Sequence, residues 1–138
     1  MVNLTLPRKQ IGIAVIWNPS GQVLIAKRKA SGTMGGLWEF PGGKIEPGET
    51  AAECIIREVR EELAIAVAVG AHLISIEHTY PTFHLSAIVH HCQHIDGIPQ
   101  PIESDEIRWV EVSDLDKYQF PAANYAIIEA ILQSRTNI

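Results

Sequence analysis

The sequence predicts a single α/β or α+β domain, residues 1–138, in which helices pack on a β-sheet. Short apolar stretches rich in β-branched residues, separated by Pro, Gly and Asn, recur along most of the chain and are typical of strands. The segment after Thr50 instead has the apolar period of a helix, and a second helical pattern closes the chain. At 138 residues, one hydrophobic core is expected.

The first part of the chain is expected to form a β-hairpin. Residues 10–17 have the pattern of a buried strand, "NPSG" at 18–21 that of a turn, and residues 22–28 that of a second strand paired with the first. The segment "LWEF" at 37–40 is predicted to be a short extended piece before a loop.

From Thr50 onward the apolar residues predict one face of an α-helix. They fall at i, i+3, i+4, i+7 and i+11, namely Ala52, Ile55, Ile56, Val59 and Leu63. Thr50 and Glu53 have the spacing of a capping box, in which each side chain bonds the backbone N–H of the other residue. The pattern therefore gives both the start of this helix and its inward face.

The second half predicts strands and a final helix. The strand patterns cover residues 65–69, 73–80, 84–92 and 108–112. The helix is expected to start near Pro121, a residue tolerated in a first turn, and to run to about residue 133. Its inward residues are expected to be Ile127, Ile128, Ile131 and Leu132.

The charge distribution argues against nucleic acid as a stable partner. The formal net charge is −5, and residues 44–63 hold acids in excess over bases, whereas a surface that binds duplex DNA should be basic. The apolar run "IGIAVIW" is too short to span a membrane, and the first ten residues lack the apolar centre of a signal peptide. Cys54 and Cys92 show no CxxC spacing. We expect a cytoplasmic protein without a membrane partner, either a monomer or a weak dimer.

Three glutamates crowd the end of the first predicted helix. Glu58, Glu61 and Glu62 fall within an arc of roughly 100°. Like charges at i and i+4 destabilise a helix, so the pattern favours a function over a purely structural choice. Mg²⁺ typically combines one or two carboxylates with waters and substrate phosphate oxygens. The cluster therefore predicts a site for phosphate chemistry, the alternative being a solvated acidic helix face.

The run from Gly43 to Ile65 resembles the Nudix box, G-x5-E-x7-R-E-U-x-E-E-x-G-U with U aliphatic, in every defined position except one. The flanks "IGIAVIWNPSGQVLIAKR", "LWEFPGGKIEPGE", "WVEV" and "FPAAN" resemble the MutT branch of this family, whose members remove oxidised guanine nucleotides. The resemblance covers most of the chain. It implies a Nudix-type α/β/α sandwich with a mixed β-sheet and the catalytic helix packed on it.

The exception is Ala64, where the family has a glycine at the end of the helix. If this position requires a left-handed conformation, alanine costs about 1 kcal/mol or somewhat more. The geometry of the helix end then affects the direction in which the Glu61 and Glu62 side chains point.

The resemblance also implies roles for individual residues. The metal ligands would be the carbonyl of Gly42 and the carboxylates of Glu58, Glu61 and Glu62, holding Mg²⁺ or, as a substitute, Mn²⁺. Glu49 would assist them, with Arg57 as its orienting partner. Lys44 would lie near phosphate or pair with an acid of the loop.

The implied reaction is substitution by water on a phosphorus of a nucleoside triphosphate, which requires a general base. Candidates are Glu61, Glu62 and an acid of the loop "PIESDEIRW", where Glu103 and Glu106 both qualify by position. We favour Glu103, although either loop glutamate is equally well explained as a solvated charge.

Four further residues are candidates for substrate binding. Arg28 is placed to reach a phosphate or the base edge, or is a surface arginine. Tyr80 and His84 lie where this branch has pocket residues, yet packing explains them nearly as well. Asn124 carries an acceptor and a donor that match N7–H and O6 of oxidised guanine, the alternative being a cap or turn residue.

The leading interpretation is Mg²⁺-dependent hydrolysis of 8-oxo-dGTP to 8-oxo-dGMP and pyrophosphate. A second interpretation keeps the chemistry and changes the substrate to another nucleoside diphosphate derivative, such as a dinucleoside polyphosphate or a nucleotide sugar. A third is a non-enzymatic module that recognises oxidised guanine, as in adenine-specific DNA glycosylases.

Overall fold

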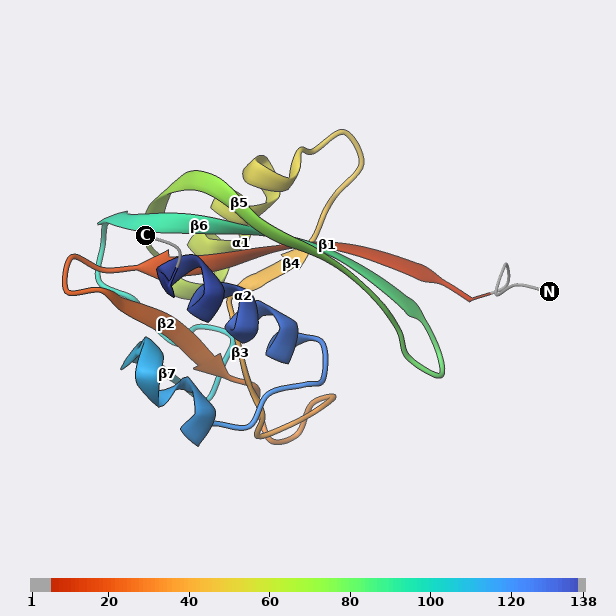
Figure 1. Cartoon of the computed structure of the whole chain (residues 1–138). Coiled ribbons are helices and arrows are strands. Elements are labelled where there is room, and N and C mark those ends of the chain that lie inside the picture. The colour runs from red at the N-terminus through yellow and green to blue at the C-terminus, as the bar shows by residue number, and fades with distance from the viewer. Residues whose placement is uncertain (1–5, 137–138) are drawn as a thin grey trace.

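The structure, a computed structural model, describes residues 6–136 (Figure 1). The elements follow in the order β1 Arg8–Trp17, β2 Gln22–Lys27, β3 Trp38–Glu39, β4 Gly42–Lys44, α1 Ala51–Leu63, β5 Ala66–Thr79, β6 His84–Asp96, β7 Glu106–Glu111, the 3-10 helix η1 Val112–Lys117 and α2 Asn124–Thr136.

The strands form one mixed sheet. The main path runs β3-β2-β1-β6-β5, while β4 pairs with β1 and β7 pairs with β2. Strand β1 pairs in parallel with β6 over the whole length of β1, from Arg8 opposite His84 to Trp17 opposite Gln93. The other pairs are antiparallel. The sheet is thus built around β1, which also carries the short β4.

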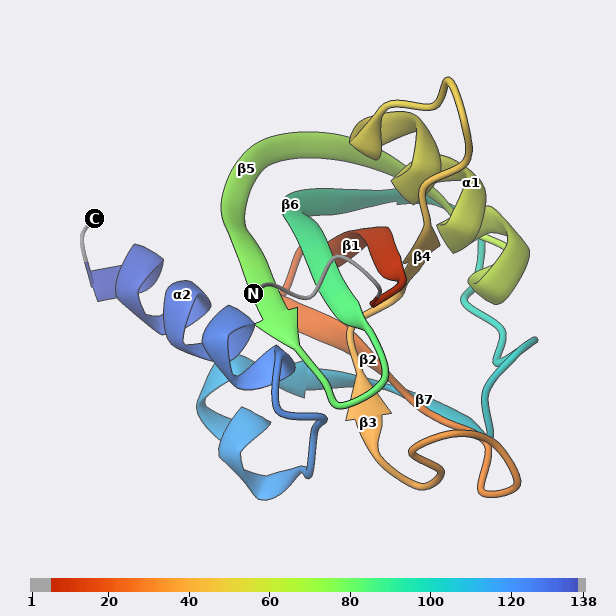
Figure 2. The ribbon, with the colours of Figure 1, turned by 90° about the vertical axis from the view of Figure 1, so that its right-hand side faces the viewer.

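The two helices cover opposite faces of the sheet (Figure 2). Side chains of β1 alternate between the core layer under α1 and the core layer under α2. Ala14 and Ile16 pack with Ile55, Val59 and Leu63 of α1. Ile13 and Val15 pack in the layer that contains Ile127, Ile128 and Ile131 of α2. Because β1 is buried on both sides, its sequence is a continuous apolar run. The predicted α/β/α sandwich with a mixed sheet is confirmed.

The local predictions for the hairpin and the first helix are confirmed. Strands β1 and β2 pair antiparallel, and Asn18 Oδ1 accepts hydrogen bonds from the N–H groups of Ser20 and Gln22 in the turn. Thr50 Oγ1 accepts from Glu53 N, and Glu53 Oε1 accepts from Thr50 N, which closes the capping box.

Several boundaries differ from the prediction. The stretches 65–69 and 73–80 belong to one strand, β5, whose pairing with β6 shifts register between Val69 and Ile74. A bulge of this kind interrupts the apolar alternation without ending the strand. Strand β7 begins at Glu106 rather than residue 108, and α2 begins at Asn124 because residues 121–123 form a turn closed by Asn124 N to Pro121 O, 2.9 Å.

Two residues predicted to face inward are exposed. Ile56 on α1 is 39% exposed and Leu132 on α2 is 46% exposed. Both lie at an edge of the apolar arc of their helix, where the side chain extends past the sheet. Among residues 6–136, no helix is long and apolar enough to cross a membrane.

Helix α1 ends at Ala64 in the left-handed region, with φ 60° and ψ 31°, and its N–H donates to Arg60 O at 3.0 Å. Alanine is strained there, whereas glycine adopts this conformation without a Cβ penalty. We expect Ala64→Gly to raise the free energy of unfolding by about 0.5–1 kcal/mol, after the greater freedom of glycine in the unfolded chain is subtracted. Urea denaturation of both proteins measures this change, and an equal or lower midpoint in the glycine variant would contradict the strain.

Candidate active site

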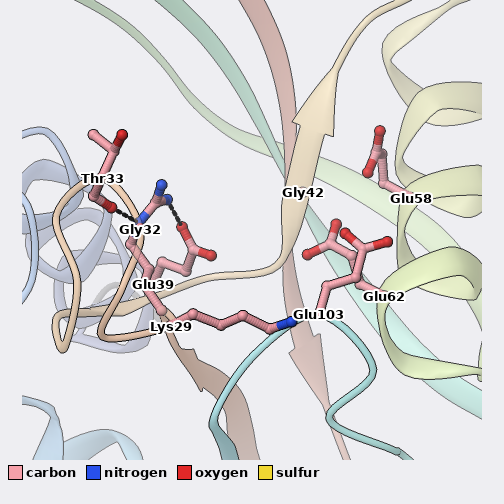
Figure 3. A pocket seen from close by; sticks show the side chains of 9 residues that line it. Lys29, Gly32, Thr33, Glu39, Gly42, Glu58, Glu62 and Glu103 are labelled. Carbon is pink, nitrogen blue, oxygen red and sulfur yellow. Dashed lines mark hydrogen bonds and ion pairs between the residues drawn. The ribbon is translucent and has the colours of Figure 1, made fainter.

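A cavity of about 300 Å³ opens between α1 and the loop that follows β2 (Figure 3). Its lining is dominated by carboxylates and small residues. It consists of Arg28, Lys29, Gly32, Thr33, Glu39, Gly42, Glu58, Glu62 and Glu103. Two of the three crowded glutamates of α1 therefore face the same space as a glutamate of the β6–β7 loop.

Glycines let β4 approach both β1 and α1. A Cβ on Gly42 would lie 2.2 Å from the carbonyl oxygen of Gly12 in β1. A Cβ on Gly43 would lie 2.3 Å from the carboxyl carbon of Glu58. The prediction did not include β4, since its sequence lacks an apolar alternation. Because Gly43 has no Cβ, the Glu58 carboxylate can lie directly against the strand.

Arg57 organises the acids on the flank of α1. It donates to both oxygens of Glu49, at 2.7 and 2.9 Å, to Glu58 at 2.9 Å and to Glu61 at 3.2 Å. It also donates to the carbonyl oxygen of Lys44 at 3.0 Å. This one guanidinium thus ties the loop before α1 to the glutamates of the helix.

Glu62 has a buried carboxylate oxygen, Oε2, that lacks a hydrogen-bond partner in the described part of the chain. Burial raises the pKa of Glu62 well above its ordinary value, and the hydrogen bond with Glu58 raises it further. A buried carboxylate oxygen without a partner, beside a second carboxylate, is a donor set that fits a hard divalent cation.

The sequence analysis placed Glu58, Glu61 and Glu62 on one arc of the helix and predicted that they form one site. In the structure, the three carboxylates do not all face the same cavity. Among residues 6–136, no group of three His, Cys, Asp or Glu side chains is positioned to hold a metal ion. Glu58 and Glu62 line the cavity, whereas Glu61 is outside the lining, has a side chain 53% exposed and pairs with Arg57. The same Arg57 nitrogen bonds Glu58 and Glu61, so Arg57 links the exposed Glu61 to a glutamate that lines the cavity.

The loop before β7 separates its two candidate bases. Glu103 lines the cavity with Glu58 and Glu62. Glu106 is instead the first residue of β7 and bonds the guanidinium of Arg108. The geometry therefore favours Glu103, the loop glutamate that the sequence analysis also favoured over Glu106.

A second cavity of about 340 Å³ adjoins the first and shares Arg28, Thr33, Glu39 and Gly42 with it. Its other lining residues are mostly apolar or aromatic: Lys9, Ile11, Ile13, Met34, Phe40, Gly43, Tyr80, Phe83, Leu85, Pro121 and Asn124. Tyr80 and Phe83 stack with ring centroids 4.8 Å apart at the tip of the β5–β6 hairpin. We call the first cavity the acidic cavity and the second the aromatic cavity; the two adjoin and form one site.

The predicted substrate residues are distributed unevenly. Tyr80 and Asn124 line the second cavity, and Arg28 lines both. Lys44 and His84 belong to neither lining. Side chains alternate along β6, so Leu85 faces the cavity while His84 bonds Glu77 at 2.7 Å and Thr79 at 2.8 Å.

Sequence reasoning missed Glu39, Lys29 and Phe83 as lining residues. Arg28 donates to Glu39 at 2.6 Å and to the carbonyl oxygen of Thr33 at 2.8 Å (Figure 3). Glu39 had one signal in the sequence, since it is a charge inside the apolar stretch "LWEF". Lys29 and Phe83 lie in loops and belong to no motif.

The pair of Glu49 and Arg57 predicts an acid-sensitive contribution to stability. Hydrogen bonds from Arg57, and one from Glu46 N, lower the pKa of Glu49 from 4.5 to about 2. A lowered pKa in the folded state stabilises it above pH 4.5, and this contribution disappears as the pH falls toward about 2. We expect the difference in unfolding free energy between the wild type and Glu49→Gln to shrink over this interval. Denaturant titrations at several pH values measure it, and a difference independent of pH would contradict the interpretation.

The mixed sheet between two helices defines an α+β fold that brings glutamates of α1 and of a loop into one cavity over a glycine strand. The chain belongs to the Nudix family, because the sequence profile described as NUDIX domain matches residues 12–130. Nudix hydrolases generally need divalent metal ions.

Named relatives and a solved structure agree with this assignment. The 8-oxo-dGTP diphosphatase of Haemophilus influenzae is 35% identical over 129 residues, which cover 93% of this chain and 94% of that protein. The CTP pyrophosphohydrolase of Escherichia coli is 31% identical over 123 residues, which cover 89% and 91%. The crystal structure of the MutT protein from Methanosarcina mazei has a TM-score of 0.85 and 26% identity, covering 96% of this chain and 99% of that one. The relatives share a reaction class and are named for different nucleotides.

Proposed function

We propose that this protein hydrolyses nucleoside triphosphates to the monophosphate and pyrophosphate with Mg²⁺, and that it prefers 8-oxo-dGTP. The main support is the pair of adjoining cavities. One has the carboxylates that a metal and a triphosphate require, and the other has the aromatic walls that a base requires. Such an enzyme would remove oxidised guanine nucleotides from the cytoplasmic pool, acting as a monomer or weak dimer without a stable nucleic-acid partner.

The metal would be held by Glu58, Glu62 and the carbonyl of Gly42, with Glu61 contributing once it leaves Arg57. Support comes from the buried oxygen of Glu62 that lacks a partner and from the close contact of Glu58 with Gly43. When bound, Mg²⁺ would neutralise phosphate charge and lower the pKa of a coordinated water.

We assign the general base to Glu103. Two lining carboxylates come from outside α1, and Glu39 is already paired with Arg28, whereas Glu103 faces the two glutamates that would hold the metal. In this role Glu103 accepts the proton of the attacking water. As the water oxygen bonds to one of the two phosphorus atoms of the α–β anhydride, the bond from that phosphorus to the bridging oxygen breaks, and the electron pair leaves with the bridging oxygen on the other phosphate. Arg57 and Glu49 position the acids and do not touch the substrate.

Base selection is assigned to Asn124. Its side-chain amide lines the aromatic cavity and makes no hydrogen bond with the residues that the structure describes, so both its donor and its acceptor are available. Oxidation converts guanine N7 from an acceptor into an N–H donor, and an amide can accept from N7–H while donating to O6. Unmodified guanine would leave the amide oxygen opposite a second acceptor.

A nucleotide panel tests the proposal. Purified protein is incubated with Mg²⁺ and 8-oxo-dGTP, dGTP, CTP or a dinucleoside polyphosphate, and pyrophosphate and orthophosphate are measured separately, with a chelator as control. We expect pyrophosphate to be released preferentially from 8-oxo-dGTP. Preference for CTP, the substrate in the name of one relative, would contradict the assigned base while keeping the reaction. Binding of 8-oxoguanine nucleotides without hydrolysis would favour a recognition module.

A further inference from the structure

Lys29 is a cation of the acidic cavity whose ammonium group has no partner among residues 6–136. It follows β2, lines the cavity opposite α1, and extends its side chain across the space toward Glu103 (Figure 3). Among the described residues, its ammonium group forms no ion pair or side-chain hydrogen bond. Three donor hydrogens therefore face the cavity without an acceptor.

The two arginine guanidinium groups near this cavity, unlike the Lys29 ammonium group, are already engaged. Arg28 is held by Glu39 and by the carbonyl oxygen of Thr33. Arg57 is surrounded by Glu49, Glu58 and Glu61. Among the described residues that line the cavity, Lys29 is thus the cation available to an incoming anion.

Backbone hydrogen bonds fix the position of Lys29. Its carbonyl oxygen accepts from Gly32 N at 3.0 Å, and the next N–H, that of Ala30, donates to Asp105 Oδ2 at 3.1 Å. Asp105 N in turn donates to Lys27 O at 3.0 Å. These bonds tie the Lys29 loop to the loop that carries Glu103, so the two side chains are placed together.

The position of Lys29 also indicates which part of a substrate it meets. It lines only the acidic cavity, whereas Arg28, Thr33, Glu39 and Gly42 line the junction with the aromatic cavity. A nucleotide with its base beside Asn124 would place its α-phosphate at this junction and its outer phosphates beyond it. Lys29 therefore lies at the end where the β- and γ-phosphates belong.

We propose that Lys29 binds the pyrophosphate portion of the substrate, an inference that rests on the function proposed above. Four carboxylates line the cavity, those of Glu39, Glu58, Glu62 and Glu103, and they oppose the entry of a polyphosphate. An ammonium group offers several donors to non-bridging phosphate oxygens as a point charge. Lys29 thereby selects for a triphosphate over a monophosphate.

The test is product affinity of the Mg²⁺-loaded protein, measured by calorimetry with pyrophosphate and separately with the nucleoside monophosphate. We expect Lys29→Ala to weaken pyrophosphate binding roughly 10-fold, as the loss of a hydrogen bond to a charged group does, and to raise KM for the triphosphate similarly. Monophosphate affinity should stay the same. Lys29→Arg should restore much of the pyrophosphate affinity, and Lys117→Ala, which removes an exposed surface charge paired with Asp114, should have no effect.

Three results would overturn the inference. The first is unchanged pyrophosphate affinity in Lys29→Ala. The second is an equal loss of pyrophosphate and monophosphate affinity, which indicates a structural role. The third is a shifted pH profile of kcat without a change in pyrophosphate affinity, which indicates that Lys29 acts on Glu103. A wild type that hydrolyses no nucleoside triphosphate would instead refute the proposed function itself.

Discussion

Glu62→Gln is expected to lower kcat roughly 100-fold or more while making the metal-free protein more stable. Both effects have one cause. The Glu62 carboxylate is partly buried beside Glu58, and its Oε2 has no partner among the described residues. Glutamine keeps the shape and removes the titratable group, so folding without metal no longer requires Glu62 to be buried as a charge or to take up a proton beside Glu58. The same change removes a charge that the metal requires.

The pH dependence of stability gives this prediction a second readout. Burial raises the pKa of Glu62 in the folded state, so above pH 4.5 the folded protein holds a proton that the unfolded chain has lost. Metal-free stability should therefore fall as the pH rises, and less so in Glu62→Gln.

Melting curves with and without Mg²⁺ complete the test. The wild type should gain thermal stability from Mg²⁺ by ligand linkage, and Glu62→Gln should gain much less. Glu129→Gln, on the exposed side of α2, is the matched control and should resemble the wild type. Near wild-type turnover of Glu62→Gln at saturating Mg²⁺, or a lower melting temperature of the metal-free variant, would show that this carboxylate does not hold the metal.

Asn124→Ala is expected to reduce the ratio of kcat/KM for 8-oxo-dGTP to that for dGTP by about 10-fold or more, since a buried polar mismatch costs about 1–3 kcal/mol. Most of the loss should fall on the oxidised nucleotide, because the amide matches its N7–H and O6 together. Hydrolysis of the phosphoanhydride should persist, as Asn124 lines only the aromatic cavity.

A paired variant separates the two hydrogen bonds. Asn124→Asp keeps an acceptor for N7–H and loses the donor for O6, an atom that both nucleotides carry, so kcat/KM should fall for both nucleotides while their ratio stays above that of the alanine variant. Circular dichroism controls for α2, which starts at this residue. An unchanged ratio in Asn124→Ala would make this residue a structural element of the helix start, and base selection would then belong to Arg28 or Tyr80.

The fold was predictable where local patterns determine structure. The apolar period of α1, its capping box and the turn at Asn18 depend on neighbours within four residues, and all three are confirmed. Strand β4 depends on a partner far along the chain, since Gly42–Lys44 pairs with β1 and carries no apolar alternation of its own. The bulge in β5 is likewise set by register against β6.

The site was predictable as a set of residue types and less so as a geometry. The box spacing located Glu58 and Glu62 on the face that lines the cavity. It could not reveal that Glu61 lies outside the lining and bonds Arg57, because a side-chain conformation depends on its surroundings, including charges from the preceding loop. The choice of Glu103 over Glu106 and the outward position of His84 both depend on where a loop or strand meets its neighbours. Lys29 has no motif, and only the folded chain brings it opposite α1.

In the proposed complex, Glu58, Glu62 and Gly42 hold a divalent cation against the outer phosphates of a nucleotide. A crystal soaked with Mn²⁺ and a non-hydrolysable 8-oxo-dGTP analogue tests it most directly, because the anomalous signal of manganese locates the ion. We predict an anomalous peak in the acidic cavity, bonded to Glu58 and Glu62, with the triphosphate beside Lys29 and the base beside Asn124. Manganese bound elsewhere, or a nucleotide bound without any ion at Glu58 and Glu62, would contradict the account.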